Sequence, residues 1–405
     1  MRLFSIFVIS LPVLLYFLCN KKRDFFCPST AFSFLYILKI VIPTVIYSFP
    51  ENIPIADEFF LEKSLCNDDV FIKYTIIQSI GYCMVLIGIR TFKTRRSFTG
   101  VKETKECISD SRRYIFWGYC FYILGVIGFF MIMSSVGGIK FFFSNLGLRT
   151  YLVRDLDFET YLLSLLNYAP LVLIYSKKWT KERIKLLDVV LVILAGIMVG
   201  LGGRKALIML VIECAAVYHY VVNPIKIKKI LNFKVIILCC LLFLFFTTYS
   251  KLRTPGAFEE YINDPVEFYQ GENEGGLTKT MAGESYVPFY VSIIDYFDNN
   301  NKWDGASFLG LLSAFIPSSF YPDKPPVDDG MYLYSLAHGN KVNPPMPTKD
   351  LDETSWPLET FGSMYANFGF IGVVMGMLLL GCVISYTFKK WFIVIMNSNM
   401  GCSIN

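Results

Sequence analysis

Long apolar segments dominate this 405-residue chain and set the first limit on its fold. Hydrophobic residues make up 54% of the chain and charged residues only 18%, whereas a soluble domain carries about 25% charged residues. A helix that crosses a membrane needs roughly 20 mostly apolar residues. The sequence therefore predicts an all-α polytopic integral membrane protein with about nine transmembrane helices, and it excludes a soluble enzyme or a disulfide-rich secreted module. The predicted spans are Leu3–Cys19, Ala31–Phe49, Phe71–Ile89, Tyr114–Ser135, Thr160–Ser176, Leu186–Gly200, Leu207–Val222, Val235–Tyr249 and Phe361–Phe388.

Lysine and arginine residues predict the orientation of these spans. They gather in every second loop, and such loops face the cytoplasm. The N-terminus is then expected outside the cytoplasm and the C-terminus inside it. The basic groups are Lys21–Arg23, Arg90–Arg113, Lys177–Lys185, Lys226–Lys234 and Lys389–Lys390.

The segment 250–360 is the only polar stretch long enough to form a domain. It holds 7 basic and 17 acidic residues, so its own charge is 7 − 17 = −10 in a chain of net charge +5. We expect a large outer loop here, between spans one to eight (residues 1–249) and the last span with its tail (residues 361–405). Apolar spacing predicts helices at Tyr286–Phe297, Ser307–Phe315 and Met331–His338. Prolines predict an extended crossing at Ile316–Pro326.

Several short motifs occur in a recognisable order along the chain. These are Gly137-Gly138 followed by Arg149 and Arg154, Gly202-Gly203-Arg204 at the outer end of a span, Ile316-Pro317 followed by Tyr321-Pro322-Asp323-Lys324-Pro325, and Glu359 followed by Asn367-Phe368-Gly369-Phe370-Ile371-Gly372. Together with the single late outer loop, this order resembles the Wzy-type O-antigen polymerases, which join oligosaccharide repeat units. The resemblance implies a fold similar to that of polytopic (GT-C-like) glycosyltransferases and O-antigen ligases.

The resemblance also implies an activity and its partners. Proteins of this family join undecaprenyl-diphosphate-linked oligosaccharides into surface polysaccharide on the periplasmic face of the bacterial inner membrane, by inverting glycosyl transfer. A chain-length regulator protein is a further expected partner, and nucleic acid is not. Two alternatives remain open, an O-antigen ligase and a lipid-linked oligosaccharide flippase. The ligase pattern has His followed by Asn, Ser or Gln, whereas His338 is followed by Gly339.

A polyprenyl diphosphate donor calls for fixed cations near its leaving group, because negative charge develops there. Arginine suits this role since it stays charged and binds phosphate oxygens bidentately. Arg204 is the first candidate, because two glycines and a helix N-terminus adjoin it. The other candidates for diphosphate or glycan binding are Arg253, Arg149, Arg154 and Lys324.

The acceptor hydroxyl needs a general base within hydrogen-bond reach. His338, the only histidine on the outer face, and Glu359, at the mouth of the last span, are the two candidates. Lys39 and Glu213 lie within predicted spans, where an ionisable group is a functional hypothesis. No spacing of Cys, His or acidic residues suggests a metal site, so we expect a metal-independent reaction without a cofactor.

Overall fold

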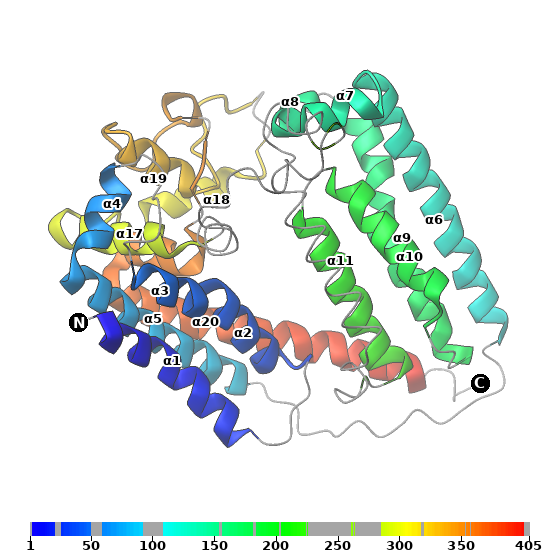
Figure 1. Ribbon diagram of the computed structural model, residues 1–405, viewed down its shortest axis with the longest axis horizontal. Coiled ribbons are helices and arrows are strands. Elements are labelled where there is room, and N and C mark those ends of the chain that lie inside the picture. Colours follow the sequence, from blue (N-terminus) through cyan, green and yellow to red (C-terminus); the bar gives the residue numbers. More distant parts are fainter. Residues whose placement is uncertain are drawn as a thin grey trace. The chain divides into compact units, whose positions relative to one another are not determined.

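The computed structural model of this protein divides into two compact units. Unit 1 comprises Met1–Ser97 and Glu274–Ile393, and unit 2 comprises Phe98–Asn273 and Val394–Asn405. The structure describes residues 2–20, 26–49, 59–91, 108–153, 156–180, 184–201, 204–223, 225, 261, 263, 285–316, 320–352, 354–356 and 358–400. Over these residues it is all-helical, with no strand (Figure 1).

The apolar segments form helices close to the predicted bounds. Six helical stretches are long and apolar enough to cross a membrane: Arg2–Cys19, Pro28–Tyr47, Asp68–Thr91, Ser111–Ser135, Asp157–Lys178 and Glu359–Trp391. Two shorter apolar stretches, Leu186–Gly200 and Ala206–Val222, coincide with further predicted spans. The predicted span Val235–Tyr249 lies outside the described residues. The prediction of a helical membrane protein is confirmed, whereas the number of spans stays a prediction.

Unit 1 contains helices from both ends of the chain. Its described helices are α1 (Arg2–Cys19), α2 (Pro28–Tyr36), the π-helix η1 (Ile37–Val41), α3 (Ile42–Tyr47), α4 (Phe59–Cys66), α5 (Asp68–Thr91), α17 (Val287–Asn299), the 3-10 helix η6 (Ala306–Phe308), α18 (Leu309–Ser313), α19 (Gly330–Ala337), the 3-10 helix η7 (Thr348–Asp350) and α20 (Glu359–Met400). Figure 1 shows α17 and α19 at one end of the bundle that includes α1, α5 and α20. The helices predicted within 250–360 thus correspond to α17, to η6 with α18, and to α19. They share one apolar core with the spans, to which Tyr74, Tyr290, Tyr332 and Tyr365 contribute fully buried rings.

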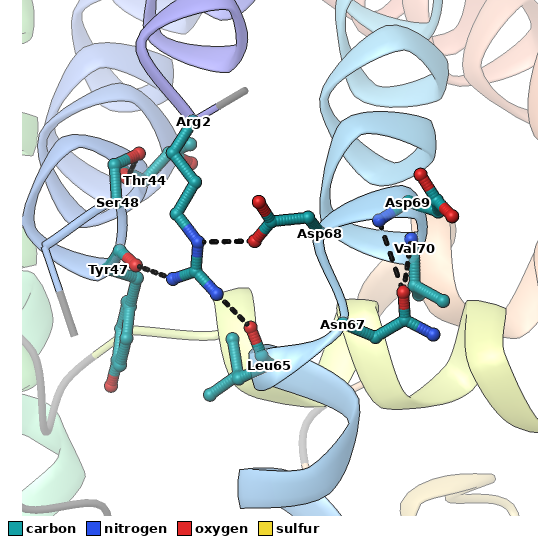
Figure 2. Close-up of polar contacts among 9 residues, drawn as sticks. All are labelled: Arg2, Thr44, Tyr47, Ser48, Leu65, Asn67, Asp68, Asp69 and Val70. Atoms are coloured by element: carbon teal, nitrogen blue, oxygen red, sulfur yellow. Dashed lines mark hydrogen bonds and ion pairs between the residues drawn. The ribbon is translucent and has the colours of Figure 1, made fainter.

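A single arginine at the start of α1 joins the ends of three other helices (Figure 2). The Arg2 guanidinium donates from Nε to Asp68 Oδ1 at 2.8 Å, from Nη1 to Tyr47 O at 3.0 Å and from Nη2 to Leu65 O at 2.8 Å. Carbonyls at the last turn of a helix lack partners within the helix, and Tyr47 ends α3 while Leu65 lies in the last turn of α4. The start of α1, the end of α3 and the start of α5 therefore lie at the same end of the helix bundle. The predicted alternation of spans expects this arrangement.

Glycines let α5 and α20 approach closely within unit 1. A Cβ added at Gly381 would meet the Val85 carbonyl oxygen, and it would lie 3.0 Å from the Cα of Gly88. Small residues at a crossing allow backbones to touch, which is how helices gain packing energy in lipid. These two glycines therefore fix where α5 crosses α20.

The helix α20 is interrupted near its start. Gly369 has φ 64° and ψ −149°, a conformation that is essentially restricted to glycine. The loop before η6 satisfies backbone groups at this break, because Trp303 N donates to Ala366 O at 3.0 Å and Asp304 N to Asn367 O at 3.1 Å. The expected continuous span from Phe361 to Phe388 is thus two helical segments that meet at Gly369.

Unit 2 contains α6 (Ile108–Ser135), α7 (Ile139–Ser144), the 3-10 helix η4 (Leu146–Leu148), α8 (Arg149–Leu152), α9 (Asp157–Thr180), α10 (Leu186–Gly200), α11 (Arg204–Val217) and the π-helix η5 (Tyr218–Val222). The helices α6 and α9 pack closely along their length, with Gly125 of α6 lying against Leu166 of α9. Leu201 ends α10 with a left-handed φ of 38°, and α11 begins at Arg204.

Candidate functional site

Glu359 begins α20 and lies exposed beside the buried face of α17. Its Oε2 accepts a hydrogen bond of 2.9 Å from the Tyr290 hydroxyl. Burial, and then the nearby charge of Glu359, raise the pKa of Tyr290 well above its ordinary value, so the hydroxyl stays protonated and donates. The backbone of Glu359 is left-handed, with φ 50°, which costs a non-glycine residue about 1–3 kcal/mol. The hydrogen bond from Tyr290 thus holds the carboxylate of a residue whose backbone is strained.

His338 lies at the exposed C-terminal end of α19. Its Nδ1 is 2.9 Å from the carbonyl oxygen of Tyr334. A carbonyl only accepts, so Nδ1 carries the proton of the neutral ring and Nε2 is left as an acceptor. This tautomer is the one in which Nε2 can take a proton from a bound hydroxyl.

His338 belongs to an aromatic cluster in unit 1. The cluster consists of Phe289, Tyr334, His338 and Trp356. Ring centroids are 4.1 Å apart for Tyr334 and His338, 5.6 Å for Tyr334 and Trp356, and 4.8 Å for Phe289 and Trp356. Phe289 and Tyr290 are neighbours in α17, so the cluster that holds His338 and the pair Tyr290–Glu359 both involve this helix.

Lys39, the ionisable residue within a predicted span, lies beside a tyrosine of this region. Lys39 lies in the π-helix η1, and its Nζ is 5.1 Å from the ring centroid of Tyr286. The Tyr286 and Tyr290 rings lie 6.3 Å apart. Single π-helical turns inside α-helices are frequent at functional sites. Lys39 thereby brings a cation from a predicted span to the same group of tyrosines.

Asp329 is a buried carboxyl that the sequence did not single out as a site residue. It precedes α19 and is only 8% exposed. Burial raises its pKa, while hydrogen bonds with Ser363 and Ser307 partly oppose the increase. Ser307 also exchanges hydrogen bonds with the fully buried Asn367. A buried carboxyl with a raised pKa is a functional-site candidate. Its burial depends on the packing of segments far apart in the chain, so the sequence alone does not reveal it.

The candidate cations are divided between the units. In unit 1, Lys324 is half-buried, and its Nζ donates to the carbonyl oxygen of Ile316 at 3.2 Å. In unit 2, Arg149 begins α8 and Arg204 begins α11. Arg253 and Arg154 lie outside the described residues. The roles of all five in diphosphate or glycan binding stay predictions.

No group of three or more Cys, His, Asp or Glu residues that could hold a metal ion occurs in the described part of the chain. Comparison of the chain with protein-family models, with curated proteins and with solved structures found no match in any of the three.

Proposed function

We propose that this protein joins lipid-linked oligosaccharide repeat units into a surface polysaccharide on the outer face of the cytoplasmic membrane. The proposal rests on the resemblance to Wzy-type polymerases and on one structural observation. Glu359, an exposed carboxylate in a strained backbone conformation, is held by the buried Tyr290 at the start of α20. Strained residues cluster at active sites, where the surrounding structure holds them in place.

In the proposed reaction Glu359 acts as general base. It takes the proton from an acceptor sugar hydroxyl, and the hydroxyl oxygen attacks the anomeric carbon of the donor. The bond from that carbon to the diphosphate oxygen breaks, and its electron pair leaves with the polyprenyl diphosphate. Attack from the face opposite the leaving group inverts the configuration at carbon.

His338 and the aromatic cluster support the binding of a glycan. Aromatic faces pack against the apolar faces of sugar rings, and an imidazole Nε2 accepts a hydrogen bond from a hydroxyl. His338 and Trp356 offer both kinds of contact, with ring centroids 6.2 Å apart. We assign to His338 the orientation of the acceptor sugar, and to Glu359 the transfer of the proton.

Complementation of a deletion strain tests the proposal. The chromosomal gene is deleted, and wild-type protein, Glu359→Gln, His338→Ala or Asp350→Asn is supplied at equal membrane abundance. Gels of the surface glycan then show the distribution of chain lengths. Asp350 is the matched control, since it is an exposed carboxylate of the same unit in η7.

We expect Glu359→Gln to leave single repeat units and to lose long chains, because removing a general base costs about 10²–10⁴-fold in rate. Asp350→Asn should give wild-type ladders. A wild-type ladder from Glu359→Gln would refute the role of this residue. If the deletion strain also lacks single units on the lipid anchor of the cell surface, the activity is transport or ligation and the polymerase proposal is wrong.

A further inference from the structure

The described residues 309–316 and 320–321, which follow η6, expose an unusual set of large apolar side chains. Phe315 is 92% exposed, Phe320 83% and Leu312 76%. Single exposed apolar residues are ordinary, but a contiguous apolar patch marks an interaction surface. The segment therefore requires a covering partner that the rest of unit 1 does not supply.

The preceding residues attach this segment to the break in α20. Gly305 N donates to Asn367 Oδ1 at 3.0 Å, and the Phe308 ring lies 6.2 Å from the ring of Phe368. Across the break, Ile371 of α20 is largely exposed as well. These contacts attach the segment to a helix that carries exposed apolar side chains of its own and is long and apolar enough to cross the membrane.

The length of α20 locates the break at the membrane boundary. From Phe370 to Trp391 the helix has 391 − 370 + 1 = 22 residues, or roughly 33 Å at 1.5 Å per residue. The hydrocarbon core of a bilayer is about 30 Å thick. Polar contacts lie on the N-terminal side of the break. There Tyr365 donates to Asp298 at 2.7 Å, and Lys73 pairs with the same carboxylate. The segment attached to the break then lies at the level of the lipid headgroups.

A groove beside α18 fits the same location. It has a volume of about 570 Å³, and the apolar side chains of Leu309, Leu312 and Ile316 form one wall while the loop around Met346 forms another. Asp323 also lines it and pairs with Lys349 at 2.6 Å. An apolar channel with an ion pair beside it matches a lipid, which has an acyl chain and a charged headgroup.

We propose that residues 309–316, together with Phe320 and Tyr321, form an interfacial anchor that lies in the bilayer surface on the side of α17 and α19. Leu312, Phe315 and Phe320 enter the acyl-chain region, and the groove beside α18 receives a lipid chain. The partner is the bilayer itself, so the inference is independent of the polymerase proposal. The anchor holds the connection between η6 and α19 at the membrane surface.

Tryptophan quenching in nanodiscs tests the anchor. Phe315→Trp is made in the full chain and placed in phosphatidylcholine nanodiscs with or without acyl-chain bromine, and the wild-type emission is subtracted. Leu312→Trp provides a second position in the patch. Lys341→Trp is the control, because Lys341 is exposed in a polar loop of the same unit.

We expect the added emission of Phe315→Trp and Leu312→Trp to lose most of its intensity to brominated lipid and little to aqueous acrylamide. Lys341→Trp should behave in the opposite way. If the two patch variants follow Lys341→Trp, the patch faces water and the proposal is wrong. If neither quencher reaches them, a protein surface covers the patch, and the proposal is wrong as well.

Discussion

Replacing Asn367 with leucine tests whether polar contacts hold the break in α20. Asn367 is fully buried. Its Oδ1 accepts from Gly305 N at 3.0 Å, and its Nδ2 donates to Ser363 O at 2.8 Å and to Ser307 Oγ at 2.8 Å. Leucine has a similar size but neither accepts nor donates, so the substitution removes the polar contacts with little change of volume.

The expected cost follows from these contacts. The Gly305 N–H loses its acceptor, and a buried unpaired group costs about 1–3 kcal/mol. Each of the two lost donor contacts adds about 0.5–1.5 kcal/mol. The more apolar leucine returns about 1–2 kcal/mol of burial energy. We therefore expect Asn367→Leu to lower the free energy of unfolding by about 2.5 kcal/mol, the middle of these ranges.

Denaturant titration in detergent micelles measures this change. Trp303 provides a local signal, because it is buried and its backbone N–H donates to Ala366 O at the break. Ser307→Ala is the comparison variant, since it keeps the contacts of Asn367 with Gly305 and Ser363. It removes one partner of Asn367 and one hydrogen bond of Asp329, and each loss should cost about 0.5–1.5 kcal/mol. If Asn367→Leu is no less stable than Ser307→Ala, the polar contacts do not hold the break and the reasoning fails.

Three further predictions use the same titration. Arg2→Lys should lower the free energy of unfolding by about 1–3 kcal/mol, because a point charge cannot replace a planar fork that meets three acceptors; the exposed Arg113→Lys should change little. Asp329→Asn should raise the unfolding midpoint at pH 7, since a raised folded-state pKa means that stability is lost as the pH rises through that pKa. This gain should vanish below the unfolded-state pKa of about 3.9, and a constant gain at every pH would contradict it. Gly88→Ala should cost about 1–3 kcal/mol by overpacking, whereas Gly200→Ala, whose Cβ would lie 3.9 Å from its nearest neighbour, should be tolerated.

The sequence predicted the helices well because their signals are local. The run Leu186–Gly200 has the bounds of α10, and the predicted helix Met331–His338 differs from α19 by one residue at each end. Apolar length and a stopping glycine are sufficient for such predictions.

The contacts that organise unit 1 could not be predicted in the same way. Arg2 lies next to the first predicted span, Leu3–Cys19, yet its partners lie 45 to 66 residues away. Asp329 owes its importance to burial, which depends on the packing of segments far apart in the chain. Gly369 lies in the motif Asn367–Gly372, but the sequence does not show its positive φ. That conformation depends on Trp303 and Asp304, a distant loop whose backbone N–H groups bind the carbonyls of Ala366 and Asn367.

The break at Gly369 changes how the position of Glu359 is determined. In a continuous helix, the depth and direction of Glu359 would follow from the membrane span itself. Instead, Glu359 belongs to the segment from Glu359 to Phe368, which precedes the break at Gly369. This segment contacts the helix after the break, because the Met364 side chain packs against Gly376. This segment is held by Tyr290, by the loop at Trp303 and by the contacts of Asn367. The position of the candidate base is therefore set by α17 and the loop before η6, and not by the part of α20 after Gly369. Loosening the contacts of Tyr290, Trp303 or Asn367 should displace the Glu359 carboxylate, while the rest of α20 still crosses the membrane.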